Sequence, residues 1–374
     1  MLKSINFDKN TNLLINSSLW LKDKNFDLIF FHLSGIFALL LLTFYLWKGD
    51  AVIFPIYNFY LIFFGIPHNY LTWATLLPEQ ARKTFNMKPI YAGAIVCFII
   101  VLLLPFTEGT TLNDWILSLI SYISLWHAYR QHHGICKIYD TIQSKRFNDK
   151  TIYADRFYLN LFFPLALYSI LLWVFTHENV QYFLSLDEKY NLIYPVIPKN
   201  IFYTYCAVTA VIGIIGLKKA IYDRNKQGRH IPWPQLSLML IAILTYIVPY
   251  FFIPVTAMPL AVAIGTIFHN VQYFGFVWLF EKYRTKEMNE ANISITFYQK
   301  LVSKNAWIKY FSIALTYSIM MIIFYLITPK HVGMTLIYFM ALSHYIIDGY
   351  MWKKDINKTL SPVLHRISIA KGEN

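Results

Sequence analysis

Long apolar runs separated by short polar segments dominate the sequence. A transmembrane helix needs about 20 mostly apolar residues, because the hydrocarbon core is about 30 Å thick and the helix rises 1.5 Å per residue. The pattern predicts an all-α, polytopic integral membrane helical bundle of about ten transmembrane helices, with eight as the lower bound. The predicted spans cover residues 29–47, 51–77, 89–106, 112–134, 158–176, 201–217, 236–253, 257–280, 306–327 and 334–352.

The polar segments complete this organisation. Residues 1–27 are rich in Asn and Lys, and they lack the apolar core and small-residue cleavage site of a signal peptide. We expect a cytoplasmic N-terminal segment over 1–27, a single multi-span membrane domain over 28–352 and a cytoplasmic C-terminal tail over 353–374. The seventh and eighth spans are expected to form a hairpin around Pro254 and Pro259. The loop over 176–200 has room for a small surface element.

The charge distribution predicts the orientation of these spans. The chain has 33 Lys and Arg against 20 Asp and Glu, a formal net charge of +13. Most basic residues fall in alternate segments, which the positive-inside rule assigns to the cytoplasm together with both termini. The opposite loops hold only Lys48, Lys189, Lys199 and Lys330. We therefore expect a multi-pass protein of the bacterial inner membrane or an equivalent one. Because the positive charge is spread along anionic lipid, no nucleic-acid partner is expected.

Composition excludes several other classes of protein. Hydrophobic residues make up 57% of the chain and charged residues only 14%, against about 25% charged in soluble domains. A disordered chain and a typical cytosolic enzyme are therefore excluded. The three cysteines, Cys97, Cys136 and Cys206, are too few for a disulfide framework or a cysteine zinc site.

Histidine is the unusual feature of the spans. Ionisable residues inside a membrane are costly, so each one is a candidate functional residue. The candidates occupy the second, fourth, eighth and tenth spans, all of which run in the same direction. At 1.5 Å per residue they lie within about one or two helical turns of each other in depth, which predicts a metal site built by facing helices. Imidazole binds iron, copper and zinc. The candidate ligands are His68, His127, His132, His133, His269 and His344.

Helical spacing supplies partners for these imidazoles. Residues four positions apart share a helix face, and a metal-bound imidazole usually donates its other N–H to a carboxylate or carbonyl. The partners Tyr273, Asp348 and Gln131 are therefore the candidate catalytic residues. The pairs at this spacing are His269–Tyr273, His344–Asp348 and His127–Gln131. In the second span, Pro67 frees a backbone carbonyl and can kink the helix beside His68.

Two other functional classes use similar residues. Intramembrane His and Asp relay protons or bind ions in transporters and ion-coupled carriers, and paired His residues hold haem in membrane electron carriers. A single intramembrane His is also often a hydrogen-bond partner between helices. The common depth of the candidates favours one site over a pathway across both leaflets.

Four short patterns resemble, in order, those of the Brp/Blh family of membrane beta-carotene dioxygenases. They are Gly65-Ile66-Pro67-His68, His132-His133-Gly134, the segment 269–278 and the segment 343–348. The resemblance is confined to these segments. It implies a multi-span helical enzyme that holds non-haem Fe(II) with His residues and uses O2 on an isoprenoid or another lipid.

Carried over by position, the resemblance implies that His68, His132 and His269 are iron ligands. The family's fourth ligand falls on Tyr273, and two of its aspartates fall on Thr72 and Lys137. These departures imply a divergent relative with a rebuilt site, in which His127 or His344 replaces the missing ligand.

Together, these patterns predict an integral membrane non-haem iron oxygenase acting on a lipid-soluble substrate, isoprenoid, carotenoid-like or otherwise. Fe(II) is the expected cofactor, with another transition metal as the alternative, and O2 is the cosubstrate. The expected partners are the substrate and membrane lipid, and the electron donor, if one is needed, stays open. The ligand on the fourth span also stays open, since depth favours His127 and the motif favours His132.

Overall fold

A computed structural model describes residues 19–76, 81–147, 158–178, 180–183, 189–226, 231–304 and 306–369. Most of the expected N-terminal segment and the last residues of the expected tail lie outside these ranges. The described chain is helical apart from one antiparallel pair, β1 (Gln181–Phe183) and β2 (Lys189–Asn191). This pair lies in the loop over 176–200, where the sequence left room for a surface element.

The first half of the chain forms a bent helical stretch followed by two long helices, α7 (Met87–Thr107) and α8 (Thr111–Phe147), and the shorter α9 (Phe163–Val174). Gly49 has a φ of +67° and begins the 3-10 turn η2 (Gly49–Val52), where the first stretch changes direction. The elements are α2 (Lys24–Leu28), η1 (Ile29–Leu33), α3 (Ser34–Lys48), η2, α4 (Ile53–Tyr60), η3 (Leu61–Gly65), α5 (Ile66–Leu76), α6 (Ala81–Thr84), α7, α8, η5 (Tyr158–Phe162) and α9.

The second half contains the central helix of the bundle. The elements are α10 (Lys199–Leu217), η6 (Lys218–Asp223), α11 (Arg224–Lys226), α12 (Trp233–Phe252), η7 (Val255–Ala257), α13 (Met258–Glu290), α14 (Phe297–Ser303), α15 (Trp307–Ile327), α16 (Lys330–Met351) and α17 (Leu360–Ile369). As expected, α12 and α13 pack together; their connection contains Pro254, and Pro259 lies in the first turn of α13.

The predicted count of ten spans is not confirmed. Within the described residues, seven helical stretches are long and apolar enough to cross a membrane, which supports a helical membrane protein. The first of them, Lys24–Leu76, contains both the first and the second predicted span. The fourth predicted span lies within the longer helix α8, and the fifth corresponds to the shorter apolar stretch Asn160–Val174. The eighth was predicted to end at residue 280, but α13 continues to Glu290.

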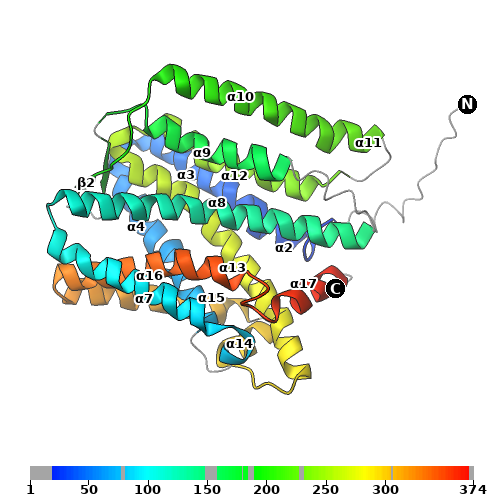
Figure 1. Cartoon of the computed structure of the whole chain (residues 1–374). Coiled ribbons are helices and arrows are strands. Elements are labelled where there is room, and N and C mark those ends of the chain that lie inside the picture. The colour runs from blue at the N-terminus through cyan, green and yellow to red at the C-terminus, as the bar shows by residue number, and fades with distance from the viewer. Residues whose placement is uncertain are drawn as a thin grey trace, which may run out of the picture.

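Helix α13 is the core of the bundle. In its most apolar window 83% of the residues are buried, against 22–50% in the other spanning stretches. It packs against α3, α4, α5, α8 and α12, and it runs between the α7–α15–α16 group and the α3–α9–α12 group (Figure 1). A methyl group at Gly275 would lie 2.5 Å from the Phe30 ring, so glycine permits this close approach. A residue on α13 can therefore meet side chains from many helices.

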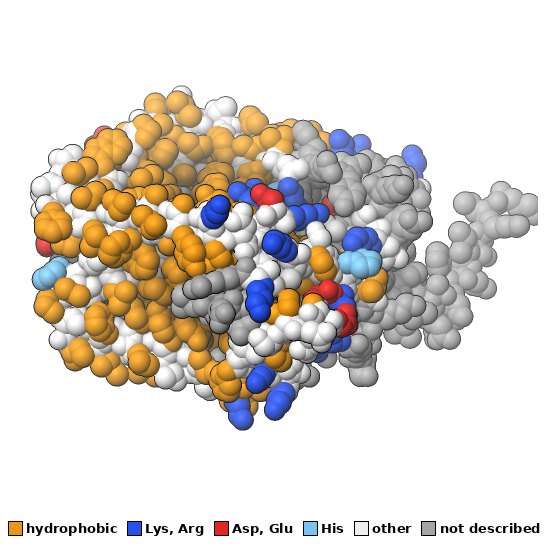
Figure 2. All heavy atoms as spheres, turned by 60° about the horizontal axis from the view of Figure 1, so that its bottom comes forward, with side chains coloured by type: hydrophobic (Ala, Val, Ile, Leu, Met, Phe, Trp, Pro, Cys, Tyr) orange, Lys and Arg blue, Asp and Glu red, His pale blue; other side chains and the backbone are white. Residues whose placement is uncertain are grey.

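Basic side chains gather at one end of the bundle, while the surface beyond them is mainly hydrophobic (Figure 2). We call this the basic end; α7 begins there, and α13 and α16 finish there. Backbone contacts show that these termini meet, because Lys358 N–H donates to the Thr84 carbonyl at 2.9 Å. The Arg284 guanidinium, on α13, donates to the Thr84 hydroxyl at 2.7 Å.

Candidate metal centre

Four buried histidines from four helices meet inside the bundle. His68 lies on α5, His127 on α8, His269 on α13 and His344 on α16. Their rings form a closed circle, in which successive ring centroids are 4.3 Å (His68–His344), 4.7 Å (His344–His127), 5.0 Å (His127–His269) and 4.8 Å (His269–His68) apart. This four-histidine cluster confirms that imidazoles from the four predicted spans reach one level.

The separation of the ring nitrogens suits a metal ion. One nitrogen from each histidine can be chosen so that all four lie within 4.8 Å of one another. Two nitrogens bound to one ion at about 2.1 Å lie about 3.0 to 4.2 Å apart, depending on the angle between them. The Nε2 atoms of His127 and His344 are already 3.1 Å apart. The widest separation in the set, at most 4.8 Å, exceeds this range by no more than about 0.6 Å.

Unpartnered nitrogens provide a second test of the fit. Within the described part of the chain, three buried ring nitrogens of the cluster have no hydrogen-bond partner. They are Nδ1 and Nε2 of His68 and Nδ1 of His269. Buried polar atoms in proteins are normally paired, because leaving them unpaired costs free energy. A metal ion would satisfy a nitrogen of each residue, so the donor set fits a transition metal that accepts imidazole.

A hydrogen-bonded chain stands behind His344. The Tyr273 hydroxyl donates to Asp348 Oδ1 at 2.7 Å, and Trp352 Nε1–H donates to the same oxygen at 2.9 Å. The Thr72 hydroxyl lies 2.8 Å from the Tyr273 oxygen and 2.5 Å from His344 Nδ1. The chain thus links the carboxylate to the imidazole through two hydroxyl groups.

With Asp348 ionised, these hydrogen bonds favour one tautomer of His344. An ionised Asp348 can only accept, so the single hydroxyl proton of Tyr273 points to Asp348. Thr72 must then donate to Tyr273 and accept from His344 Nδ1–H. This leaves the lone pair of His344 on Nε2, the nitrogen that faces His127, in the state that a metal ligand requires.

Asp348 also lies behind a second histidine. Its Oδ2 is 4.0 Å from His127 Nδ1, on the far side of that ring from His344. The predicted contact between His344 and Asp348 is therefore indirect, since it runs through Tyr273 and Thr72. Asp348 itself lies close to His127. Tyr273, which shares a face with His269, serves instead as a link in the Asp348 chain.

The remaining candidates on α8 lie beside the cluster. The ring of His132 stacks on Phe268 at 5.3 Å and lies 5.6 Å from His269, outside the set of four. His133 Nε2 bonds to Asn160 Oδ1 at 2.8 Å. Gln131 Nε2 donates to the backbone carbonyl of His269 at 2.7 Å and so joins α8 to α13.

The backbone before His68 is adapted to the site. Pro67 has no N–H to give to the preceding turn, and the chain forms the π-helical turn η3 directly before α5. Such turns are frequent at functional sites because they redirect the side chains that follow. The predicted distortion at Pro67 therefore takes the form of a wide turn.

Thr72 was not among the functional residues predicted from the sequence pattern. A signal existed, since it lies four residues after His68 and shares its helix face. The resemblance to the Brp/Blh family also placed a family aspartate at this position. In the structure Thr72 provides the oxygen that holds His344, a role that a carboxylate could equally fill.

No protein-family model matches the chain, and no curated protein or solved structure shows significant similarity to it. Function is therefore inferred from the geometry of the four-histidine cluster.

Proposed function

We propose that the protein is an integral membrane non-haem iron oxygenase that acts on a lipid-soluble substrate. The observation that carries the proposal is the closed circle of His68, His127, His269 and His344 inside a bundle of apolar helices. The four imidazoles would hold the ion, and coordination positions left open by the protein would be available to O2. Bound Fe(II) would supply the activation of O2.

The chain's own residues would supply the rest of the reaction environment. The four imidazoles would hold the ion, and an ionised Asp348 would place a negative charge near it in a low-dielectric interior. Tyr273 and Thr72 keep Nε2 of His344 unprotonated and aimed at the ion. The apolar core around α13 excludes water, which limits side reactions of activated oxygen.

The location of the site supports a lipid-soluble substrate. The cluster lies within helices whose outer surfaces are largely exposed Leu, Ile and Phe, and a lipid-soluble molecule can approach such a site from the bilayer. The resemblance to the Brp/Blh family supports an isoprenoid or related lipid. We propose His127 and His344, rather than His132, as the ligands that complete the site.

The orientation is part of the same proposal. We infer that the basic end faces the cytoplasm, with both termini on that side, because loops that stay in the cytoplasm retain Lys and Arg. Anionic lipids of the cytoplasmic leaflet would then meet these side chains.

Metal analysis tests the proposal. We expect the full chain, purified in a mild detergent and supplied with Fe(II), to retain one iron per chain. Nitric oxide should then give the electron paramagnetic resonance signal of a ferrous nitrosyl centre, because a coordination position is open. Protein that stays metal-free with Fe(II), Mn(II), Co(II) and Zn(II) would disprove a metal site. Zinc binding without a nitrosyl signal would reject the oxygenase alone, and a Soret band would indicate haem.

Asp348 provides a graded test of the same site. Asp348→Asn removes the charge behind His127 and the acceptor that orders Tyr273 and Thr72. Loss of such supporting groups typically weakens metal affinity about 10- to 100-fold, and we expect that range in competition with a fluorescent chelator. Asp355→Asn, at an exposed position outside the cluster, removes the same charge and should leave the affinity unchanged. Equal affinities in Asp348→Asn and the wild type would contradict this role.

A further inference from the structure

An open pocket of about 680 Å³ lies at the basic end, away from the four-histidine cluster. Its lining includes Lys88 and Tyr91 near the start of α7, and Asp355 and Lys358 in the segment between α16 and α17. We call it the lysine pocket. Its volume falls within the range of small-ligand sites, about 300 to 1,000 Å³.

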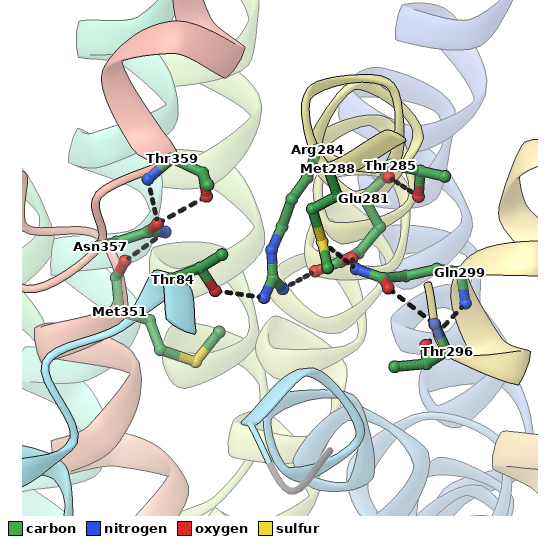
Figure 3. Close-up of polar contacts among 10 residues, drawn as sticks. All are labelled: Thr84, Glu281, Arg284, Thr285, Met288, Thr296, Gln299, Met351, Asn357 and Thr359. Carbon is green, nitrogen blue, oxygen red and sulfur yellow. Dashed lines mark hydrogen bonds and ion pairs between the residues drawn. The ribbon is translucent and has the colours of Figure 1, made fainter. Parts of the chain in front are cut away.

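The two walls of the lysine pocket are fixed to each other by the backbone. Phe85 and Asn357 form a β-bridge, and Asn86 N–H donates to the Ile356 carbonyl at 2.7 Å. The Asn357 side chain donates to the Met351 carbonyl at 3.1 Å and accepts from Thr359 (Figure 3). The pocket is therefore formed by paired chain segments and is present before any ligand binds.

Positive charge dominates the surface around the pocket. Lys88 and Lys358 line it, and the exposed side chains of Lys83, Lys353 and Lys354 belong to the same two segments. Asp355 is the acidic residue in the lining. Lysine ammonium groups are compact point charges that bind phosphate well. The chemistry of the pocket thus favours an anion that carries phosphate.

An apolar stripe runs from the pocket along α7. Tyr91, Ile95, Phe98, Ile99 and Leu102 are exposed, and their spacing places them on one helix face. From Tyr91 to Leu102 the helix rises about 16 Å, roughly the depth of one leaflet of a 30 Å hydrocarbon core. A ligand in the pocket can therefore extend an acyl chain along α7.

We propose that the lysine pocket binds the phosphate-bearing headgroup of an anionic phospholipid, whose acyl chain lies on the α7 stripe. A free phosphate compound would satisfy the lysines but would leave the stripe without a role, so the stripe favours the lipid. The pocket adjoins the segment that follows α16, and its lining residues are separate from the four-histidine cluster.

Native mass spectrometry of the full chain in a neutral detergent tests this proposal. We expect phosphatidylglycerol to bind in preference to phosphatidylcholine. Each lysine near an anionic surface contributes about 1 kcal/mol of binding free energy. The loss of two lysines therefore corresponds to about a 30-fold loss of affinity. Lys88→Gln/Lys358→Gln should weaken phosphatidylglycerol binding by about this factor, whereas Asp355→Asn should strengthen it.

Lys300→Gln/Lys304→Gln is the matched control, since both lysines are exposed on or next to α14 and lie outside the pocket lining. The control should bind phosphatidylglycerol as the wild type does. Unchanged binding in Lys88→Gln/Lys358→Gln, or equal loss in the control, would overturn the site. If millimolar inorganic phosphate occupies the pocket and displaces the lipid to the same extent, the pocket binds a free anion. That result would overturn the proposal of a lipid site. All four altered lysines are exposed, so folding should be unaffected, as melting temperatures will show.

Discussion

Metal binding is expected to disappear in His127→Ala and to persist in His132→Ala. His127 Nε2 lies 3.1 Å from His344 Nε2, within the four-histidine cluster, and its Nδ1 faces Asp348. Removal of a direct ligand should cost more than the 10- to 100-fold typical of a group behind a ligand. His132 stacks on Phe268 outside the set, so its loss removes no metal–nitrogen bond.

The two substitutions are matched, because both residues are buried on α8 and each substitution removes one imidazole. Metal per chain after dialysis against a weak chelator provides the measurement, with His133→Ala as a further control. His68→Ala, His269→Ala and His344→Ala should behave like His127→Ala. The opposite result, with metal lost from His132→Ala and kept by His127→Ala, would show that the ligand set of the Brp/Blh motifs applies and that the cluster geometry misleads.

Depth along the membrane was predictable for these histidines, but direction around the helix was not. The rise of 1.5 Å per residue fixes depth from sequence position alone. Residues 127 and 132 differ by five positions, which turns their side chains to well-separated faces of α8 at 3.6 residues per turn. Which face meets α13 depends on how α8 is rotated by its neighbours. The bond from Gln131, on the face of His127, to the His269 carbonyl shows the rotation adopted.

The role of Thr72 was hidden for a related reason. Most span hydroxyls bond to a carbonyl one turn earlier in their own helix, as Thr316 does to Ser312 and Thr107 to Leu103. The sequence therefore does not show which hydroxyl bonds to its own helix and which reaches another helix. Thr72 instead meets Tyr273 and His344, and these contacts arise only once α5, α13 and α16 are packed.

Helix α8 contains the fourth predicted span, but within the described residues it is not among the seven stretches that are long and apolar enough to cross a membrane. Helix α8 carries His127, Arg130, Gln131, His132 and His133 within two turns. These residues lower the apolar character of the helix, although α8 packs between α9, α12 and α16. The apolar runs thus predicted the helical bundle, while the exact set of crossings depends on polar helices.

The eighth span was predicted to end at residue 280, but α13 continues beyond it and contains a buried ion pair there. Arg284 donates to Glu281 at 2.7 Å and to the Thr84 hydroxyl at 2.7 Å (Figure 3). Its guanidinium also lies over the Phe85 ring. Glu281 also accepts from Gln299 at 2.9 Å. This network ties α13 to α6, beside the lysine pocket, and to α14.

We therefore expect Arg284→Met to be among the most destabilising substitutions in the chain. It leaves Glu281, which is 1% exposed, as a buried charge without its cation, a change that costs about 3 to 5 kcal/mol. The double variant Glu281→Gln/Arg284→Met removes both charges and keeps an amide for Gln299, so it should recover most of that loss. Unfolding in sodium dodecyl sulfate, followed by tryptophan fluorescence, measures the free energies. Because Arg284 lies 15 residues from His269, about 22 Å along α13, the folded fraction of both variants should keep its metal. Equal destabilisation by the single and double variants would show that packing of the Arg284 side chain, rather than the paired charge, stabilises this end of the bundle.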